Sequence, residues 1–256
     1  MGELAALLAR ARRDARQVRD PLPPALVPPD ADAAYTANAE VAALLGWESL
    51  GWKIAGTTAA VRARLGLDGP IYGRTFRRFA LSSPARLPHA ELLDPLVECE
   101  FFVTLARDLP LRDRAWTMAE VAWAVGEVYA GIEVAECRFP MAALPPLPVI
   151  LADGAASGRY VFGDRIEVPL DRLASVEVML EVDGAPRRRG SGAEVMDDPL
   201  SPLLWLAEER RRLGRGLATG ETVSTGSCTG MLPVRAGQRV RAVFGGTATV
   251  EIAFAA

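Results

Sequence analysis

Apolar and polar residues alternate along several stretches of the second half of the chain. The clearest stretch is 97–105, where the apolar side chains lie at the odd positions. A period of two predicts a β-strand with one face toward the core. Residues 176–182 alternate in the same way, and the Asp183-Gly184 step after them is typical of a tight hairpin turn. From 221 to 254 we expect short strands separated by glycine-rich turns.

A helical spacing of apolar residues marks a second set of segments. We expect helices over 3–19, 31–45, 58–65, 117–130 and 199–214. Thr117 and Glu120 have the spacing of a capping box, and Gly131 is expected to stop the helix that they begin. Asp198-Pro199 supplies a start signal for the last helix. A proline-rich connector, 21–29, separates the first two.

These elements predict an α+β chain. A helical N-terminal portion, 1–90, precedes a β-rich body, 91–256, into which two helices are inserted, and the two portions are expected to form one structural unit. The chain has 256 residues, of which 50% are apolar, so it is long enough to bury a sizeable core. A charged fraction of 24% is ordinary for a folded protein and excludes global disorder.

Charge and composition exclude several kinds of partner. The net charge is −3 and no basic stripe is present, so no nucleic-acid partner is expected, and the arginine runs 187–189 and 210–212 are expected to be solvated. No apolar run reaches the ~18 residues of a membrane span, so no membrane partner is expected. The chain lacks the pattern of a secretory signal, and its 3 cysteines fit neither a disulfide framework nor a zinc site. We therefore expect a cytoplasmic protein.

Lys53 is the only lysine among 29 basic side chains, and all the others are arginines. Under a bias toward GC-rich codons, surface lysines drift to arginine, because solvent accepts either cation. A lysine that persists can do what a guanidinium cannot, such as release a proton. Function and chance survival both explain Lys53 at this point. The only histidine, His89, follows a proline in an expected loop, where a structural role is the simpler interpretation.

Glu98 and Glu100 lie two residues apart in the strand expected over 97–105. Strand side chains alternate between faces, so both carboxylates point to the same side. Neighbouring carboxylates in a pocket repel unless a cation holds them, and a set of oxygen ligands suits Mg²⁺ or Mn²⁺. The alternative is the solvated face of an edge strand, although Phe102 on the same face argues against it.

Three further positions are weaker candidates for a site. Glu133 lies in an apolar segment and could be a third carboxylate, with Glu136 as its competitor. The loop 225–230 is rich in hydroxyl groups and could present N–H groups to a substrate carboxylate. Ser191, between two glycines, has the same possibility. Ordinary turns explain both of these loops as well.

Several segments, taken in order, resemble one known family. They are Gly51-Trp52-Lys53-Ile54, Asp68-Gly69-Pro70-Ile71-Tyr72-Gly73, Glu98-Cys99-Glu100, Arg107-Asp108-Leu109-Pro110, Ile132-Glu133-Val134, Leu151-Ala152-Asp153, Gly190-Ser191-Gly192-Ala193, Asp198-Pro199-Leu200, Trp205-Leu206-Ala207 and Thr225-Gly226. Their order and spacing resemble the fumarylacetoacetate hydrolase superfamily. Within it they resemble the 2-keto-4-pentenoate (2-hydroxypenta-2,4-dienoate) hydratases and the related 2-oxo-3-enedioate decarboxylases.

The resemblance implies a fumarylacetoacetate-hydrolase-like fold, a mixed β-sandwich or β-roll, assembled into homo-oligomers. It implies a Mg²⁺ or Mn²⁺ ion held by Glu98, Glu100 and Glu133, with Lys53 as the catalytic residue. It also implies a small 2-oxo or 2-hydroxy-dienoic acid as substrate, in the catabolism of aromatic compounds. The implied substrate contacts are Thr57, Tyr72, Asp153, Ser191, Thr225 and Gly226.

The reaction implied by the resemblance is that of a lyase. Water adds to a 2-hydroxy-2,4-dienoate, through its 2-oxo-3-enoate tautomer, to give a 4-hydroxy-2-oxo acid. Lys53 would move the proton, and we expect burial and a nearby cation to lower its pKa. A 2-oxo-3-enedioate decarboxylase, an acylpyruvate-type carbon–carbon hydrolase and a non-catalytic binding or scaffold protein are the alternatives.

Three positions depart from the pattern of the hydratases. Ala55 stands where glycine is common, and Ile71 stands where some hydratases have aspartate. Residues 154–156 read Gly-Ala-Ala, where asparagine and serine are common. The implied metal ligands are all present, so these departures concern the polar contacts that choose the substrate.

Overall fold

The computed structural model describes residues 2–256, apart from the side chain of Arg64. The α-helices are α1 (Glu3–Asp14), α2 (Ala31–Leu45), α3 (Ala59–Leu65), α4 (Met118–Ala124), α5 (Leu147–Ala152) and α6 (Leu200–Arg212). Short 3₁₀ helices are η1 (Pro24–Leu26), η2 (Arg77–Phe79), η3 (His89–Glu91), η4 (Met141–Ala143), η5 (Leu170–Ser175) and η6 (Gly192–Glu194). The strands are β1 (Ser49–Ala55), β2 (Ile71–Phe76), β3 (Ala80–Ser82), β4 (Ala85–Pro88), β5 (Leu96–Leu105), β6 (Val125–Ala135), β7 (Arg159–Arg165), β8 (Glu177–Val182), β9 (Ala185–Ser191), β10 (Thr222–Ser224), β11 (Leu232–Pro233), β12 (Arg239–Phe244) and β13 (Ala248–Ala255).

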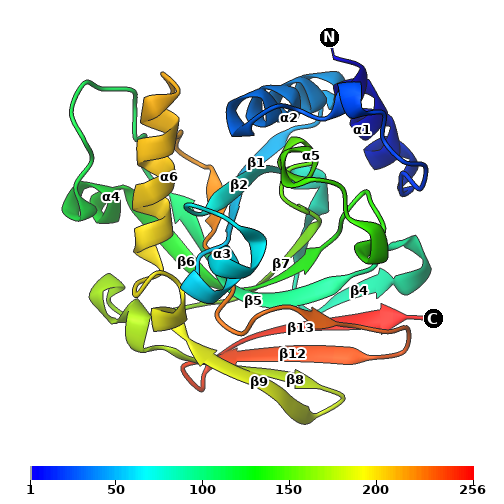
Figure 1. Cartoon of the computed structure of the whole chain (residues 1–256). Helices are drawn as coiled ribbons and strands as arrows, with labels where there is room; N and C mark the ends of the chain where they lie inside the picture. The colour runs from blue at the N-terminus through cyan, green and yellow to red at the C-terminus, as the bar shows by residue number, and fades with distance from the viewer. Residues whose placement is uncertain (1) are drawn as a thin grey trace.

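Two sheets form the centre of the molecule (Figure 1). The larger sheet has the strand order β2-β1-β10-β5-β6-β7-β3, and β11 also pairs with β5. The smaller sheet has the order β4-β13-β12-β8-β9 and lies at the bottom of the view. Most neighbouring strands are antiparallel, whereas β1–β10, β3–β7 and β4–β13 are parallel pairs. Two sheets with helices around them confirm the predicted α+β class and its mixed β architecture.

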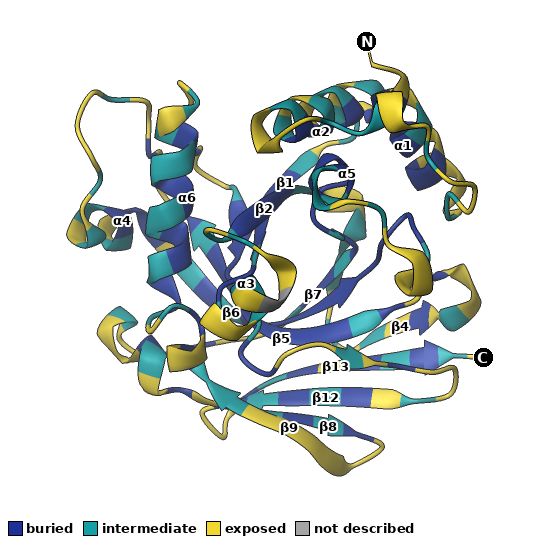
Figure 2. Cartoon of the chain, viewed as in Figure 1, coloured by how far each residue is buried: buried dark blue, intermediate teal, exposed yellow. Residues whose placement is uncertain are grey.

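Strands β5 and β6 lie in the interior of the larger sheet and are buried over most of their length (Figure 2). Their register places Glu98 opposite Glu133 and Cys99 opposite Ile132. Residues that lie directly opposite each other point to the same face of a sheet. The two carboxylates therefore share one face, while Cys99 and Ile132 enter the main apolar core on the other.

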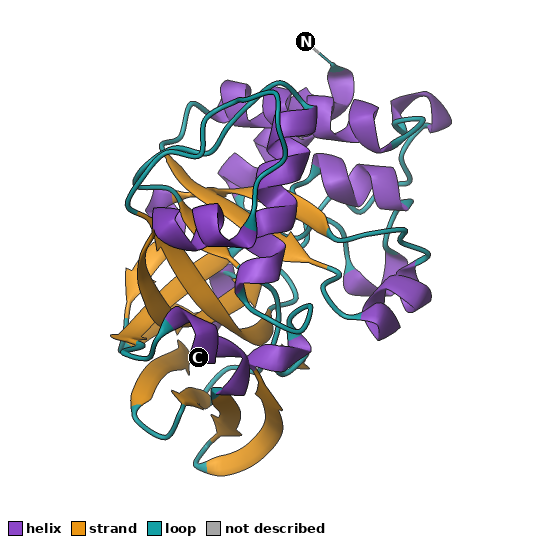
Figure 3. Cartoon of the chain, turned by 90° about the vertical axis from the view of Figure 1, so that its left-hand side faces the viewer, coloured by secondary structure: helices purple, strands orange, loops and turns teal. Residues whose placement is uncertain are grey.

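Helices pack against the sheets in two groups (Figures 1 and 3). At the top of Figure 1, α1, α2 and α5 surround an apolar cluster that includes Leu8, Val41 and Val149. On the left, α4 packs beside α6, whose Leu203 and Leu206 join the main core; Figure 3 views the molecule from this side. No helix within residues 2–256 is long and apolar enough to cross a membrane.

Most of the predicted elements are confirmed. The helix predicted over 31–45 is α2, and the one predicted over 58–65 is α3, which Gly66 closes with a φ of 64°. The Asp183-Gly184 step joins β8 to β9 as a hairpin. The helix predicted over 3–19 is shorter, because Ala15 takes a left-handed conformation, with a φ of 48°, directly after α1.

The prediction of a helix over 117–130 is wrong in its second half. Thr117 does form the capping box, but α4 ends at Ala124 and Gly131 lies inside β6. The segment after Ala124 pairs with β5 and β7 instead, so packing within the sheet overrides the local helix signal. Glycine is required at 131 because a Cβ there would lie 2.6 Å from the Phe102 ring.

The two arginine runs differ from each other. Arg187–189 are exposed, as predicted. The prediction of a solvated surface is wrong for Arg210, which is only 7% exposed. Arg210 follows Leu206 by one helical turn, so it faces inward, and its guanidinium carbon lies 4.3 Å from the centre of the Trp52 ring. This cation–π contact joins α6 to β1.

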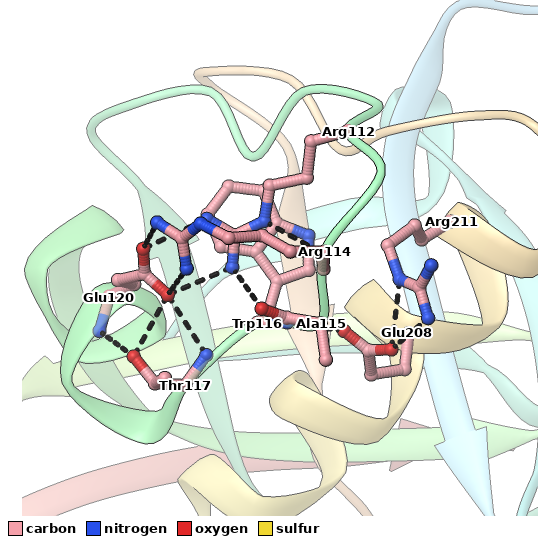
Figure 4. A network of polar contacts seen from close by, with 8 residues as sticks. All are labelled: Arg112, Arg114, Ala115, Trp116, Thr117, Glu120, Glu208 and Arg211. Atoms are coloured by element: carbon pink, nitrogen blue, oxygen red, sulfur yellow. Dashed lines mark hydrogen bonds and ion pairs between the residues drawn. The ribbon is translucent and has the colours of Figure 1, made fainter.

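A polar network joins the loop before α4 to α6 (Figure 4). Glu120 accepts hydrogen bonds from Arg112 at 2.8 Å and from the Thr117 hydroxyl at 2.9 Å. These donors, Arg112 above all, hold the pKa of Glu120 well below its usual range. On α6, Glu208 accepts from the Trp116 N–H at 2.6 Å. The network fixes the loop, although solvent screens the charge pairs.

Candidate active site

Three buried carboxylates meet between β5 and β6. Glu98 and Glu100 project from β5 and Glu133 projects from β6, and none of them is more than 5% exposed. One carboxylate oxygen from each lies within 4.8 Å of the others. The structure therefore brings together the three residues expected to hold a metal ion. Because β5 lies between β10 and β6, the solvated edge strand considered for Glu98 and Glu100 is not what the chain forms.

Lys53 ends in this carboxylate cluster. Its Nζ lies 3.4 Å from Glu133 Oε2 and donates to the Ala155 carbonyl at 3.0 Å, and its side chain is 1% exposed. Gly73 lies opposite Lys53 on β2, and a Cβ there would lie 2.0 Å from the Gly154 carbonyl oxygen. This glycine makes room for the turn that carries Ala155. Strand β1 thus delivers the only lysine of the chain to the carboxylates.

Burial raises the pKa of all three carboxylates. For Glu98, loss of solvation outweighs the opposing effect of Lys53. For Glu100, burial and the neighbouring Glu133 and Glu98 act in the same direction and raise its pKa well above its ordinary value. Burial raises the pKa of Glu133 to about 7, against the opposing effect of Lys53. These carboxylates resist losing their protons unless a cation balances them.

The pKa of Lys53 is raised rather than lowered. Burial by itself lowers it, but the carboxylates of Glu133, Glu98 and Glu100 outweigh burial. The direction is opposite to the one expected for a lysine beside a cation, because three carboxylates surround the ammonium group. The charge balance of the cluster therefore decides how easily Lys53 releases a proton.

Residues 224–226 line one side of the cluster. The Ser224 hydroxyl and the Gly226 N–H both donate to Glu100 Oε2, the latter at 3.1 Å. The Thr225 hydroxyl is buried and has no hydrogen-bond partner among the described residues. Thr57 packs on Gly226, where a Cβ would lie 2.5 Å from its methyl group. Three of the expected substrate contacts, Thr57, Thr225 and Gly226, thus lie at or next to the cluster.

Tyr160 and Ser224 touch the cluster, although the sequence does not single them out. The Tyr160 hydroxyl donates to Glu133 Oε1 at 3.2 Å and shares a hydrogen bond with the Ser157 hydroxyl at 2.9 Å. Burial raises the pKa of Tyr160 well above its ordinary value, so the phenol keeps its proton and donates it. Tyr160 lies opposite Glu133 in the β6–β7 register, and only that register reveals its role.

Three other expected contacts lie apart from the carboxylates. Tyr72 stacks on Tyr35 with ring centres 4.0 Å apart, and it lies beside Ile54 on the sheet face opposite Lys53. Asp153 is fully buried and is bound by arginines. Ser191 ends β9 in the smaller sheet. Within residues 2–256, no hydrogen bond or ion pair joins these three side chains to the cluster.

Glu136 and His89 have structural partners. Glu136 forms an ion pair with Arg159 and accepts from the Leu93 N–H at 3.0 Å. His89 Nε2 lies 3.1 Å from the Val234 carbonyl oxygen. Glu133 rather than its competitor Glu136 therefore completes the cluster, and the histidine is not part of it.

The cluster fits a hard divalent cation. Its ligand atoms are all carboxylate oxygens, which Mg²⁺, Mn²⁺ and Ca²⁺ prefer. Glu133 Oε2 is buried and has no hydrogen-bond partner among the described residues, although Lys53 lies near it. An oxygen left without a donor in this position, beside carboxylates with raised pKa values, is what an absent cation would explain.

Similar proteins are found by sequence and by structure, although no protein-family model matches the chain. The 2-keto-4-pentenoate hydratase of Paraburkholderia phymatum is 32% identical over 249 residues, which cover 96% of this chain and 94% of that protein. The 2-keto-4-pentenoate hydratase of Burkholderia vietnamiensis is 31% identical over 258 residues, which cover 99% and 97%. The solved structure of 4-oxalocrotonate decarboxylase from Pseudomonas putida G7, complexed with magnesium and adipate, matches with a TM-score of 0.88 at 24% identity and covers 98% of this chain and 95% of that one.

The two sheets and the buried carboxylate cluster define a protein of the fumarylacetoacetate hydrolase superfamily. Within that superfamily, the chain belongs to the family of the 2-keto-4-pentenoate hydratases and the related decarboxylases. The resemblance stated from the sequence motifs is confirmed.

Proposed function

We propose that the chain is a hydro-lyase that adds water to a 2-hydroxy-2,4-dienoate and releases a 4-hydroxy-2-oxo acid. The observation that carries this proposal is the 3.4 Å ion pair between Lys53 and Glu133, buried beside Glu98 and Glu100. Two relatives that cover nearly the whole chain are named 2-keto-4-pentenoate hydratases, which supports the same reaction.

Glu98, Glu100 and Glu133 would hold a Mg²⁺ or Mn²⁺ ion. When bound, such an ion supplies Lewis-acid stabilisation of the negative charge that develops on the substrate. Ser224 and Gly226 donate to Glu100 and so fix the direction in which this carboxylate points. The structural neighbour that contains magnesium supports a divalent ion for this family.

Lys53 would move the proton during the reaction. Transfer of a proton from the 2-hydroxyl group to C5 converts the dienoate into a 2-oxo-3-enoate, whose C4 is electrophilic. The oxygen of water then bonds to C4 and a proton is added at C3, so the product contains the substrate and one water. Glu133 and the Ala155 carbonyl orient the Lys53 amine, which can give and accept these protons.

A 2-oxo-3-enedioate decarboxylase is the second candidate. The structural neighbour with a TM-score of 0.88 is named a 4-oxalocrotonate decarboxylase, which favours this alternative over the remaining two. A hydrolase that uses a histidine–glutamate pair is less well supported, since His89 lies against the Val234 carbonyl. A non-catalytic binding or scaffold role leaves the buried Lys53–Glu133 pair without a purpose.

The test is the fate of 2-hydroxypenta-2,4-dienoate with the purified chain and Mg²⁺. Loss of the diene absorbance and NMR of the product are expected to show 4-hydroxy-2-oxopentanoate, and only when both protein and metal are present. A folded sample that binds Mg²⁺ and leaves the diene unchanged would contradict the proposal. Release of CO₂ from a 2-oxo-3-enedioate would then support the decarboxylase, cleavage of an acylpyruvate the hydrolase, and no turnover the binding role.

We further propose that the chain works as a homo-oligomer in the cytoplasm, in the catabolism of aromatic compounds. Cys99, Cys137 and Cys228 are all free and buried, which suits a reducing compartment. Leu111 is 54% and Trp123 65% exposed, and apolar surface of this kind suits contact with a second copy. Light scattering is expected to give a multiple of 27.4 kDa, and a monomer would contradict the oligomer.

A further inference from the structure

The turn between α5 and β7 has an unusual backbone. Gly154, Ala155 and Ala156 all take left-handed conformations, with φ values of 83°, 53° and 60°. Alanine seldom adopts this conformation, because its Cβ crowds the backbone. Two consecutive alanines in this region therefore need contacts from outside the turn to hold them there.

The turn supplies two contacts to the active site. The Ala155 carbonyl accepts from Lys53 Nζ at 3.0 Å. The Ser157 hydroxyl lies 2.9 Å from the Tyr160 hydroxyl, which donates to Glu133. The turn thus orients Lys53 directly and Glu133 through Tyr160, without itself belonging to the carboxylate cluster.

Two buried arginines hold this turn at both of its ends. At the start, Arg138 Nε lies 2.9 Å and Arg12 Nε 3.2 Å from the Asp153 carboxylate, and Arg12 also donates to the Asp153 carbonyl. At the end, the Ser157 carbonyl accepts from Arg138 at 2.9 Å and from Arg12 at 3.4 Å. The two guanidinium groups therefore bridge Asp153 and Ser157 and close the turn between them.

Arg12 reaches this position from the opposite end of the chain. It lies in the last turn of α1, which packs with α2 near α5 at the top of Figure 1, and its side chain is 4% exposed. Asp153 lies 141 residues further along. Burial lowers the pKa of Arg12 to about 10 despite the Asp153 carboxylate. A guanidinium is costly to bury, so its full set of partners on one turn indicates a specific task.

We propose that Arg12 is a positioning residue for the reaction. Through Asp153 and Ser157 it holds the turn that aims the Ala155 carbonyl at Lys53 and the Ser157 hydroxyl at Tyr160. This inference rests on the proposed function for the identity of the reaction. It also assigns Asp153 to the support of the catalytic lysine rather than to contact with the substrate.

The neighbouring Arg13 provides a matched control. It lies in the same turn of α1 and is exposed, and it donates to the Leu44 carbonyl of α2, so it also docks the helix. Arg12→Met is expected to lower kcat by about 10²-fold, because a small displacement of a catalytic group has an effect of that size. KM and the affinity for Mg²⁺ are expected to stay within about twofold, since neither substrate nor cation contacts Arg12. Arg13→Met is expected to leave kcat unchanged.

A second readout does not depend on turnover. Because Lys53 is the only lysine, protein labelled with ¹⁵N-lysine gives one side-chain ammonium signal in NMR. Arg12→Met is expected to shift or broaden that signal, and Arg13→Met is expected to leave it in place. If the wild-type protein shows no hydratase activity, the proposed function fails, while this signal still tests whether Arg12 positions Lys53.

Arg12→Lys keeps the charge but cannot bridge both ends of the turn, because an ammonium group lacks the planar fork of a guanidinium. We expect it to lie between the wild type and Arg12→Met in kcat, with a displaced Lys53 signal. It decides the question if Arg12→Met does not fold. A folded variant at position 12 with wild-type kcat and an unmoved Lys53 signal would overturn the proposal.

Discussion

At the scale of single residues, each ionisable group of the site is held by a partner of opposite charge or by a hydrogen-bond donor. Lys53 lies against Glu133, Tyr160 donates to that same carboxylate, and Glu100 accepts from Ser224. These contacts fix the directions in which the groups point before any substrate arrives. Such preorganisation is what catalysis requires of the protein.

Lys53→Met tests the central residue, because it keeps the length of the side chain and removes the amine. General acid–base catalysis contributes about 10²–10⁴-fold, so turnover of the diene is expected to fall by at least about 10²-fold. Mg²⁺ affinity, measured by calorimetry, is expected to be equal or greater, since a positive charge leaves the carboxylates. Arg189→Met on the exposed strand β9 serves as the control. Turnover that survives in Lys53→Met would rule out the assigned role.

The residues of the site differ in how far the sequence could predict them. Glu98 and Glu100 follow from strand alternation, and Lys53 stands out because it is the only lysine. Tyr160 and Arg12 could not be found in this way, because their roles depend on residues that the fold brings to them from elsewhere in the chain. The same reason explains why Asp153, named from a motif, has arginines for partners.

At the scale of elements, sequence signals located the starts of helices and strands better than their ends. The capping box at Thr117 begins α4 as predicted, but no local signal shows that the segment after Ala124 would pair with β5. Gly131 was taken as a helix stop, whereas it serves close packing against Phe102. What the sequence could not supply was therefore the contact between distant segments.

Gly131→Ala tests this packing. A methyl group at 131 would lie 2.6 Å from the Phe102 ring, so β5 or the ring must shift. Overpacking of this kind costs about 1–3 kcal/mol, and we expect the free energy of unfolding in urea to fall by that amount. Gly69→Ala is the control, because nothing lies within 4 Å of a Cβ there. Equal stability of the two variants would contradict the tight contact.

At the scale of the whole molecule, the buried carboxylates couple metal binding to pH. Without metal, Glu133 has a pKa of about 7 in the fold against an ordinary 4.5, so between these values the folded chain binds more protons than the unfolded chain. The contribution of Glu133 to the free energy of unfolding therefore falls as pH rises through this window. A divalent cation must displace the same protons.

We therefore expect Mg²⁺ to raise the thermal midpoint more at about pH 8 than at about pH 6, because fewer protons compete for the carboxylates. The measurement is a thermal melt with Mg²⁺ and with EDTA at each pH. Glu133→Gln, which keeps the shape and removes the titration, is expected to lose most of the stabilisation by Mg²⁺ at both pH values. A Mg²⁺ effect that is independent of pH in the wild type would contradict this coupling.

We also propose that the portions 1–90 and 91–256 form one structural unit. Strands β1 and β2 from the first portion lie in the same sheet as β5 and β6 from the second, and Arg12 forms an ion pair with Asp153. Urea unfolding followed by tryptophan fluorescence and by circular dichroism is expected to give coincident single transitions. Two separated transitions would show that the portions unfold independently.

The position of Lys53 has a chemical consequence for the surface. The described surface offers guanidinium groups but no side-chain amine, because the only lysine is 1% exposed. Acylating reagents that attack amines thus have no accessible side-chain target in the folded chain. Acylation of Lys53 can proceed only when the strands around it separate. Its rate would therefore report, at a single residue, how often the interior of the larger sheet opens to solvent.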